Sequence, residues 1–533
     1  MHSLKRIVLF AAILAAISLV PSYLFAADFY IAQSASGTAD GSSCANASAC
    51  AWFNNASNWA NPKQIGKIGP GDTVHICGTV TNPNDMTDPL LVARGNGWPG
   101  APITILWEAG AKLTQPAGPL FDSADHNYLT LDGGMGGIVE NTQNGDQLEY
   151  QFPTKAITMS GIGNEVRNLI IQNIYIHVSP NNKPAGWNTS PMGVYAYPMS
   201  GGLSIDHCVF SNVAFAIDVA PSPGASGLYI HDNSFTKYDH GVAFGGANPP
   251  GFSGIEIYNN IFGSTANWDT AQNNWHHDGI HLFQAPGATI SNIRIFNNTF
   301  DGNWGANNTS HIYLECNYTH PVPDESCSDI QIYNNVHIQY PGDKLTNGFL
   351  QEMNVVGVKA YNNTYLGSGN VVGSTAVFLS SQSPTFVNNY IAGVSTFVAV
   401  QPSGTITSGA INDNVYANLV ASGNYPFSIA GGPHYTSLSA WQGATGQDAN
   451  SNSASNCSPS ANGFCTNLGL NGDGTLQSNS PGLSIGADLT SLGMTTLDSD
   501  RIGNARPPAS AWDVGAYEHV DASLPPPTGL CLK

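Results

Sequence analysis

A short phrase recurs along the chain and restricts its fold more than any other feature. The phrase alternates apolar and polar residues and then turns at two adjacent asparagines, as in IEIYNNIF, which ends at Phe262, and IRIFNNTF, which ends at Phe300. Related phrases follow at intervals of 25 to 38 residues, a period typical of solenoids and propellers. The recurring asparagines are Asn233, Asn260, Asn298, Asn335, Asn363, Asn389 and Asn414.

Each repeat predicts short strands joined by polar turns. Alternation of apolar and polar residues is the pattern of a half-buried strand. A second strand follows the turn, for example GVAFGG from Gly241 and GIHLFQ from Gly279, with no helical stretch between the strands. This predicts an all-β parallel β-helix, a solenoid whose coils stack at about 4.8 Å. The asparagines then lie one above the other, and we expect their side-chain amides to form a ladder.

Composition and charge exclude some classes of partner. Only 10% of the residues are charged and 42% are hydrophobic, which argues against disorder. The formal net charge is −20, with only 16 Lys and Arg residues. Such a chain cannot neutralise phosphates, so we expect no nucleic-acid partner. It would also repel an anionic polymer unless a metal ion intervened.

The N-terminal residues 1–27 are typical of a secretory signal. Lys5 and Arg6 precede an apolar run from Ile7 to Val20, and small residues follow near Ala26. The run is short for a bilayer span, and no later segment is apolar enough to cross. We therefore expect a secreted protein, extracellular or periplasmic, without a membrane span after cleavage.

Export permits disulfides, and the chain has nine cysteines. Three pairs are close in sequence and would each close a loop, whereas no partner is evident for Cys77, Cys208 or Cys531. The expected pairs are Cys44 with Cys50, Cys316 with Cys327, and Cys457 with Cys465.

Several segments resemble secreted right-handed parallel β-helix proteins of the pectate-lyase-like superfamily. They are DFYIAQSASG from Asp28, PGDTVHICGTV from Pro70, the asparagine coils, and the closing run that ends in WDVGAYE. The resemblance implies a single-stranded right-handed solenoid with inserted loops. It also implies an entrance over 28–78, a β-helix over 79–430, last coils with a cap over 431–520, and a proline-rich tail over 521–533. This scaffold hosts lyases, hydrolases, epimerases and adhesins, so it does not specify an activity.

Two coils are longer than the others and carry aromatic residues in their extra segments. The additional residues fall at about 263–277, 301–308 and 316–329. Insertions in solenoids lie on one side, often the binding side. Because aromatic faces suit sugar rings, Trp268, Trp275 and Trp304 are predicted to bind substrate. The alternative is that they only anchor long loops.

The second strands predict a cluster of chemically active side chains. Aligning their inward apolar residues, from Ile217 through Val242, Ile280 and Ile312 to Phe349, places a set of polar residues on one outward face. The expected catalytic residues are Asp278, His240, His277, His281, Glu315 and Tyr313. The expected substrate-binding residues are His311, Asp218 and Glu352 on this face and Lys237 at its edge, where His277 and Asp239 also lie.

Other interpretations of these residues stay open. His240 and Asp278 each precede a glycine and could be turn residues only. Glu315 and Glu352 share a slot one coil apart in this alignment, so they could repel one another or bind calcium through oxygen ligands. No other cofactor is expected.

The predicted face suits the cleavage of a polysaccharide. Hydrolysis needs two carboxyl groups, whereas β-elimination from a uronide needs a base, a proton donor and a group that neutralises the carboxylate. Lys237 is the only cation near the face, which favours hydrolysis. The G-H-G and R-I-K motifs of polygalacturonases and the D-P-H motif of mannuronan epimerases are absent.

We therefore expect a monomeric glycoside hydrolase that cleaves an extracellular polysaccharide, with Asp278 as general acid or base. The first alternative is a lyase or epimerase that uses His277 or His281 with Tyr313. The second alternative is a non-catalytic surface adhesin.

Overall fold

The computed structural model describes residues 26–520 apart from several internal segments. Most of the predicted signal segment and the whole proline-rich tail therefore lie outside the described residues. The internal segments not described are residues 83–86, 145–153, 176–190, 246–250, 266–276, 284–288, 306–307, 317–326, 341–347, 354, 370–374, 380–383, 401–409 and 421–423.

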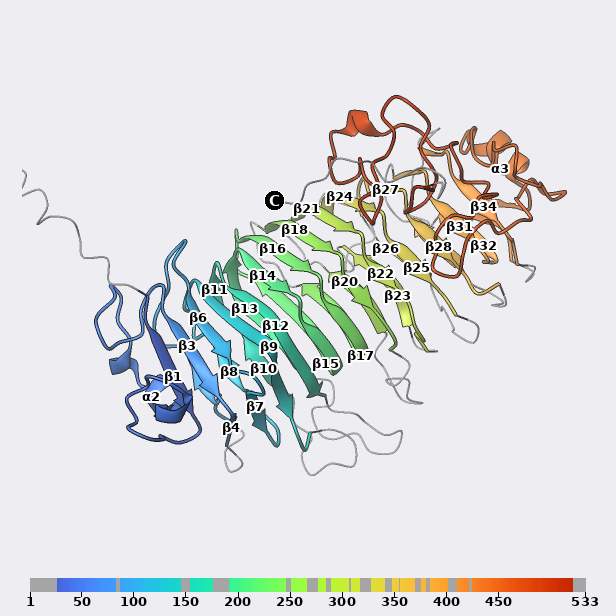
Figure 1. The fold of residues 1–533 in the computed structure, drawn as a ribbon. Helices are drawn as coiled ribbons and strands as arrows, with labels where there is room; N and C mark the ends of the chain where they lie inside the picture. Colours follow the sequence, from blue (N-terminus) through green and yellow to red (C-terminus); the bar gives the residue numbers. More distant parts are fainter. Residues whose placement is uncertain are drawn as a thin grey trace, which may run out of the picture.

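Parallel strands stack into an elongated solenoid, and the predicted parallel β-helix is confirmed (Figure 1). Each coil contributes strands to three sheets, and nearly all pairings join one coil to the next in parallel. The first sheet contains β1 (Asp28–Ala32), β3 (Thr73–Cys77), β6 (Ile103–Trp107), β9 (Leu129–Asn141), β12 (Glu165–Ile174), β14 (Leu203–Asp206), β16 (Ser226–His231), β18 (Phe252–Tyr258), β21 (Ile290–Phe296), β24 (Cys327–Tyr333), β27 (Lys359–Tyr361), β30 (Thr385–Val387) and β33 (Ile411–Asn412).

The other two sheets follow the asparagine turn of each coil. The longest strands bend through a corner and contribute to two sheets. The second sheet contains β4 (Thr79–Thr81), β7 (Lys112–Gln115), the ends of β9 and β12, the starts of β15 (Val209–Pro221) and β17 (Ser234–Gly245), β19 (Ile261–Phe262), β22 (Thr299–Phe300), β25 (Val336–Ile338), β28 (Thr364–Leu366), β31 (Tyr390–Ala392) and β34 (Val415–Ala417). The third sheet contains β5 (Leu91–Val92), β8 (Phe121–Asp122), β10 (Lys155–Thr158), β13 (Met192–Gly201), the ends of β15 and β17, β20 (His277–Phe283), β23 (Asn308–Glu315), β26 (Leu350–Met353), β29 (Thr375–Leu379), β32 (Thr396–Val400) and β35 (Phe427–Ile429).

The recurring asparagines form the predicted ladder. The Nδ2 of Asn335 donates to the carbonyl of Ile295 (2.8 Å) and to Oδ1 of Asn363 (3.0 Å). Its Oδ1 accepts from the backbone N–H and from Nδ2 of Asn298, both at 3.0 Å. The pattern repeats from Asn233 to Asn414. These side chains are buried, and the ladder together with the neighbouring backbone supplies hydrogen-bond partners for their amide groups.

The residue before each ladder asparagine explains why the phrase contains two asparagines. At this position the backbone is left-handed, with φ between 49° and 60°, a conformation that asparagine and aspartate tolerate better than most side chains. The positions are Asp232, Asn259, Asn297, Asn334, Asn362, Asn388 and Asp413.

An aromatic column fills the interior behind the ladder. The rings of Phe235, Phe262 and Phe300 stack almost in parallel with centroids 4.7 and 4.8 Å apart. His337 takes the same slot in the next coil, 4.6 Å from Phe300, and Tyr365 continues the column. The terminal aromatic residue of the repeated phrase therefore belongs to the core.

The C-terminal part closes the last coil and then folds back. Asn414, the last rung, donates from Nδ2 to Asp448 (3.2 Å) and from its backbone N–H to Ser451 (2.9 Å). Helix α3 (Leu438–Thr445) places Trp441 flat against Phe427, at 5.0 Å, and β36 (His434–Tyr435) pairs with β35 in antiparallel orientation. The following residues run back over the outside of the coils, as the red segments in Figure 1 show.

The remaining regular elements are short. The helix α2 (Cys50–Phe53) lies near the N-terminus, and the other short elements are β2 (Ser48–Ala49), β11 (Gly161–Ile162), and the 3₁₀ turns at Cys44–Asn46, Ala56–Asn58 and Thr490–Leu492. Within the described part of the chain, no helix has the length and apolarity that crossing a membrane requires.

Two of the three predicted disulfides are confirmed. Cys316 bonds to Cys327, and Cys457 bonds to Cys465. The predicted pair of Cys44 with Cys50 is wrong, because Cys44 bonds to Cys77. Cys77 ends β3, which packs against the turn that carries Cys44, so the two residues are neighbours in space although 33 residues separate them in sequence.

Replacing Asn335 by leucine tests the ladder. The variant keeps a similar side-chain volume but removes the acceptor for two N–H groups of Asn298 and the donor to Ile295. We expect a loss of about 1–3 kcal/mol in the free energy of unfolding, measured by denaturant titration. Asn479→Leu, at an exposed position, is the control. Equal stability of the two variants would contradict a structural role for the ladder.

Cysteine labelling tests the corrected pairing. Peptide mapping of non-reduced protein should link Cys44 to Cys77 and leave Cys50 as a thiol. Burial raises the pKa of the Cys50 thiol, and it raises that of the fully buried Cys208 to about 12. Alkylation of folded protein should therefore modify Cys50 slowly and Cys208 only after unfolding. A peptide that links Cys44 to Cys50 would refute the assignment.

Candidate functional site

The predicted register of the outward face holds across β17 and β20 and into β23. Val242 pairs with Ile280, and Ile280 with Ile312. His240 pairs with Asp278, one coil apart, as expected. On the outward side, one slot runs through Asp218, Ala243, His281 and Tyr313. The structure therefore brings together the central residues of the predicted cluster.

Histidine and carboxyl groups alternate through the buried cluster. Asp239 accepts from Nδ1 of His277 (2.7 Å) through one oxygen and contacts Nδ1 of His240 (2.9 Å) through the other. Nε2 of His240 lies 3.5 Å from Oδ2 of Asp278. On the other side, Nδ1 of His281 lies 3.7 Å from the same oxygen.

The series ends at the carboxyl group nearest the surface. Nε2 of His281 lies 3.0 Å from Oε2 of Glu315. Asp278 is 0% exposed and His281 is 6% exposed, whereas the Glu315 side chain is 21% exposed. Glu315 is thus the member of the series with the greatest access to solvent.

Burial and hydrogen bonds set the protonation of the two central carboxyl groups in opposite directions. Burial alone would raise the pKa of Asp239, but the hydrogen bonds from His240 and His277 outweigh it and lower the pKa to about 2. Burial raises the pKa of Asp278 well above its usual value, although the N–H of Ser310 donates to its Oδ1 (3.1 Å). Burial also lowers the pKa of His281 and so favours the neutral imidazole.

Two outward side chains flank the cluster along the solenoid axis. The ring of Tyr313 stacks on that of His281 with centroids 4.8 Å apart, and burial raises the pKa of its hydroxyl. Asp218 lies two coils earlier in the same slot. Burial raises its pKa to about 6, against the opposing effect of Lys155.

Glu352 does not belong to the outward face, contrary to the prediction. Leu350 rather than Phe349 pairs with Ile312, so Glu352 lies opposite Leu314 and is 2% exposed. A shift of one residue turns every side chain of a strand to the other face. The Glu315–Glu352 pair that suggested a calcium site is therefore not assembled.

His311 and Trp304 lie in the core and not on the predicted binding surface. His311 packs against Trp304 at 4.1 Å between ring centroids, and its Nδ1 lies 3.2 Å from Nδ1 of His337. Burial lowers the pKa of both histidines well below the usual value, which keeps them neutral. His311 occupies a corner of the coil, where the strict alternation of a flat strand does not hold.

Glycines at the same corner of the two preceding coils explain why the side chain of His311 points inward. A Cβ atom at Gly241 would lie 2.7 Å from the ring of Phe262, and one at Gly279 would lie 2.8 Å from the ring of Phe300. The slot therefore points into the aromatic column. The glycines after His240 and Asp278 are required by this close approach, whatever the preceding residues do.

The remaining predicted binding residues divide between exposed and undescribed positions. Lys237 has an exposed side chain at a left-handed backbone position, φ 55°, outside the buried cluster. Trp268 and Trp275 lie outside the described residues. Asp239, which joins His240 to His277, was expected only at the edge of the cluster. Its position directly before His240 was the available signal.

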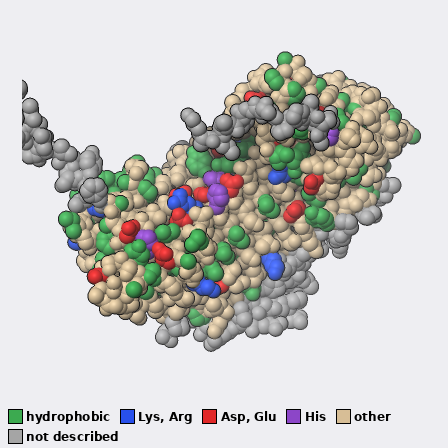
Figure 2. All heavy atoms as spheres, in the orientation of Figure 1, with side chains coloured by type: hydrophobic (Ala, Val, Ile, Leu, Met, Phe, Trp, Pro, Cys, Tyr) green, Lys and Arg blue, Asp and Glu red, His purple; other side chains and the backbone are tan. Residues whose placement is uncertain are grey.

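A different face of the solenoid carries simple acid–histidine pairs. Figure 2 shows histidine, acidic and basic side chains gathered over the first sheet near β14 and β16. There His207 contacts Asp206 and His231 contacts Asp232, each at 2.8 Å, but no second carboxyl group joins these rings among the described residues. These pairs are matched controls for the buried cluster.

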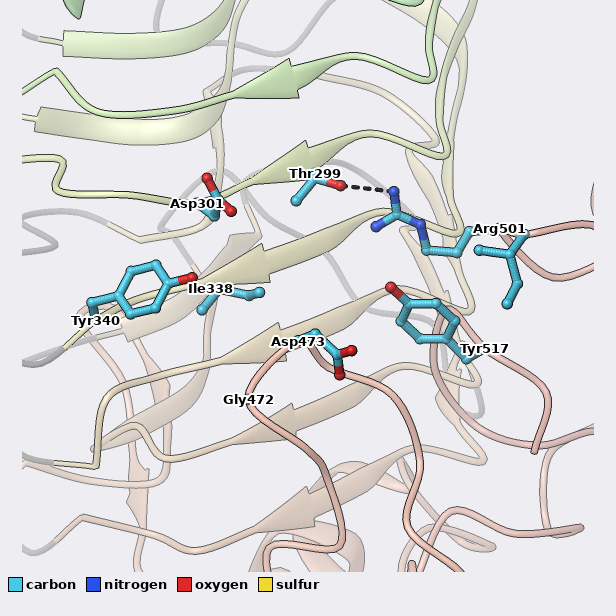
Figure 3. Close-up of a pocket in the computed structure, with 9 residues that line it drawn as sticks. Thr299, Asp301, Ile338, Tyr340, Gly472, Asp473, Arg501 and Tyr517 are labelled. Carbon is cyan, nitrogen blue, oxygen red and sulfur yellow. Dashed lines mark hydrogen bonds between the residues drawn. The ribbon is translucent and has the colours of Figure 1, made fainter. Parts of the chain in front are cut away.

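The fold-back of the C-terminal part and the second sheet together line an open pocket of about 520 Å³ (Figure 3). Arg501 crosses it and donates to Oγ1 of Thr299 (2.7 Å), and Tyr340 and Tyr517 contribute aromatic rings. Burial raises the pKa of Asp301 at its edge. The pocket has polar and aromatic walls, and none of the described residues that line it is a histidine.

Comparisons with known proteins give similar solved structures but no sequence match. No family model and no curated protein sequence matches the chain. Among solved structures it is similar to pectate lyase Pel9A, with 15% identity, a TM-score of 0.41, and coverage of 94% of this chain and 98% of that chain. It is also similar to the GH136 lacto-N-biosidase from Eubacterium ramulus, with 11% identity, a TM-score of 0.35, and coverage of 75% and 66%.

The pH dependence of stability tests the environment of Asp218. Its pKa is raised in the folded state, so the folded protein keeps a proton that the unfolded chain has released between about pH 4 and pH 6, and stability falls as pH rises through this window. Asp218→Asn should therefore be more stable than the parent at pH 7–8, by on the order of 1 kcal/mol, and equally stable near pH 4. Denaturant titrations at several pH values give this difference.

Asp488 supplies a contrast for that measurement. The backbone N–H of Thr490 lowers its pKa, so Asp488→Asn should not stabilise the protein at pH 7. A stability difference for Asp218→Asn that does not change with pH would contradict the assignment.

Proposed function

We propose that this protein is a secreted enzyme that hydrolyses glycosidic bonds of an extracellular polysaccharide at the third sheet. The observation that carries the proposal is the placement of two carboxyl groups, Asp278 and Glu315, on opposite sides of the His281 ring. Three disulfides and an N-terminal segment typical of a secretory signal support export.

Hydrolysis of a glycosidic bond uses two carboxyl groups whose separation decides the stereochemistry. In retaining enzymes the groups are about 5–5.5 Å apart, and in inverting enzymes about 6.5–9.5 Å, which leaves room for a water molecule. An imidazole ring between Asp278 and Glu315 keeps them apart and favours inversion. Glu315, the more exposed group, would protonate the leaving oxygen, while Asp278 and the histidines beneath would position and activate water.

The residues around the cluster favour a neutral or weakly charged polymer as the substrate. The slot that contains Tyr195, Asp218, His281 and Tyr313 runs along the solenoid axis, so a linear chain can lie across successive coils. Tyrosine rings supply flat apolar area for sugar faces. A net charge of −20 opposes the approach of a polyanion.

A lyase on the same site is the second candidate. The stacking of Tyr313 on His281 favours it, since tyrosine and histidine can act as proton donor and base. Elimination also needs a cation for the uronate carboxylate. In β17, β20 and β23 the single Lys or Arg is Lys237, whose exposed side chain lies outside the cluster. Lys155 of β10 is a further cation on this sheet, but it lies over the ring of Tyr195 (3.8 Å) and beside Asp218, not beside Asp278 or Glu315. The charge balance at the cluster itself therefore favours hydrolysis.

A glycan panel tests the reaction class. Purified protein should release reducing ends from at least one neutral polysaccharide without forming the unsaturated product that absorbs in the near ultraviolet. Absorbance that rises with acidic glycans would transfer the assignment to a lyase. If no polymer is cleaved but one is bound, the protein is an adhesin.

Substitution of Asp278 tests the site. Asp278→Asn should lower kcat by about 100-fold or more and leave the melting temperature nearly unchanged, because asparagine has nearly the same volume as aspartate and its Oδ1 can still accept from the N–H of Ser310. Asp232→Asn, in the acid–histidine pair of the first sheet, is the matched control and should retain full activity. Normal turnover in both Asp278→Asn and Glu315→Gln would show that this face is not the catalytic site.

A further inference from the structure

Three side chains from two adjacent coils converge on one point at the third sheet. His240 comes from β17, and Asp278 and His281 come from β20. One nitrogen of each ring and one carboxylate oxygen lie within 4.8 Å of one another, and all three residues are buried. Two imidazoles and a carboxylate are a donor set that divalent transition ions prefer.

The distances at this point suit metal ligands better than hydrogen bonds. Oδ2 of Asp278 lies 3.5 Å from Nε2 of His240 and 3.7 Å from Nδ1 of His281. Hydrogen bonds between nitrogen and oxygen are usually about 2.7–3.2 Å long. Two ligands on a tetrahedral ion with bonds of 2.0–2.2 Å lie about 3.4 Å apart, close to both distances.

The outer nitrogen of each ring is held by a carboxylate. Nδ1 of His240 lies 2.9 Å from Asp239, and Nε2 of His281 lies 3.0 Å from Glu315. Metal-bound histidines almost always donate their second N–H to such a group, which fixes the tautomer and raises the basicity of the ligating nitrogen. Asp239 is itself fixed by His277 at 2.7 Å.

The two inner ring nitrogens face the same carboxylate oxygen. Nε2 of His240 and Nδ1 of His281 both lie close to Oδ2 of Asp278. A single cation placed between these three atoms would contact all of them.

We propose that His240, Asp278 and His281 bind one divalent transition ion, with Zn²⁺ as the best match to the donors. Calcium is a poorer match, because it takes six to eight oxygen ligands. Three protein ligands leave one tetrahedral position, in which a bound water would become a nucleophile at neutral pH beside Glu315. In this arrangement Asp278 would act as a ligand that holds the ion, and Glu315 would still transfer a proton.

Binding is independent of the proposed hydrolysis and can be measured without a substrate. Untagged, disulfide-bonded protein would carry Cys50→Ser to remove the accessible thiol, be stripped with a chelator, and be titrated with ZnCl₂ by calorimetry. We expect one ion per chain with micromolar or tighter affinity and a higher melting temperature after loading. Co²⁺ should give the intense visible absorption of a tetrahedral site. No stoichiometric binding up to 100 µM Zn²⁺ would overturn the proposal.

Variants locate the ion. His281→Ala and Asp278→Ala should weaken Zn²⁺ binding by about 100-fold or more, and Glu315→Gln by about 10- to 100-fold through loss of the outer contact. Glu315→Gln is the safeguard against misfolding, since its side chain is partly exposed. His231→Ala, in the histidine pair of the first sheet, should bind Zn²⁺ like the parent. Unchanged affinity in folded Glu315→Gln and Asp278→Ala would overturn the proposed ligands.

Activity separates this inference from the proposed function. Loss of glycan cleavage on chelation, restored by Zn²⁺, would support both. Stoichiometric Zn²⁺ binding at these residues without cleavage of any glycan would support the metal site and reject the hydrolase. Full cleavage by protein that binds no ion would reject the metal site and retain the hydrolase.

Discussion

The bond between successive ladder asparagines is the interaction on which the rest of the structure depends. Successive coils of a parallel β-helix stack in register only if the turn between the first and second strands has the same geometry in every coil. Each ladder asparagine imposes this condition, because its Oδ1 accepts from the coil before it and its Nδ2 donates to the coil after it. Once the turns are aligned, the aromatic column and the strand register follow. That register determines the positions of Asp278 and Glu315 in the third sheet.

The candidate site uses the solenoid in a specific way. Slots in neighbouring coils are about 4.8 Å apart, which is close enough for side chains of two coils to share one contact. His240 and Asp278 are 38 residues apart in sequence and yet directly opposite in the sheet. The interior beside them is already filled by the aromatic column, so the polar groups satisfy one another at the corner instead of being hydrated. This explains why five ionisable side chains are gathered in a small buried volume.

The sequence was sufficient to predict the features that follow from the repeat period. It was not sufficient where a shift of one residue changes the face on which a side chain lies. The ladder, the parallel coils and the pairing of His240 with Asp278 follow from a repeat that is visible in the letters. Glu352 was misplaced because the chain before it is long and the strand β26 is short, so the alignment of its apolar residues allowed two registers. His311 was misplaced because a coil corner breaks the alternation of a flat strand. The Cys44–Cys77 bond joins neighbours in space that are distant in sequence, which spacing along the chain does not reveal.

The last rung of the ladder has a consequence for the whole molecule. All the amides point the same way along the axis, so the stack has a donating end and an accepting end, as a filament does. At the donating end Asp448 and Ser451 accept the bonds that a further coil would accept, and Trp441 covers the ring of Phe427 in the last strand of the third sheet. These residues form a cap that ends the stack of coils. Without them, the exposed edge of one molecule would offer a template to the next, and molecules would add end to end as the subunits of a fibre.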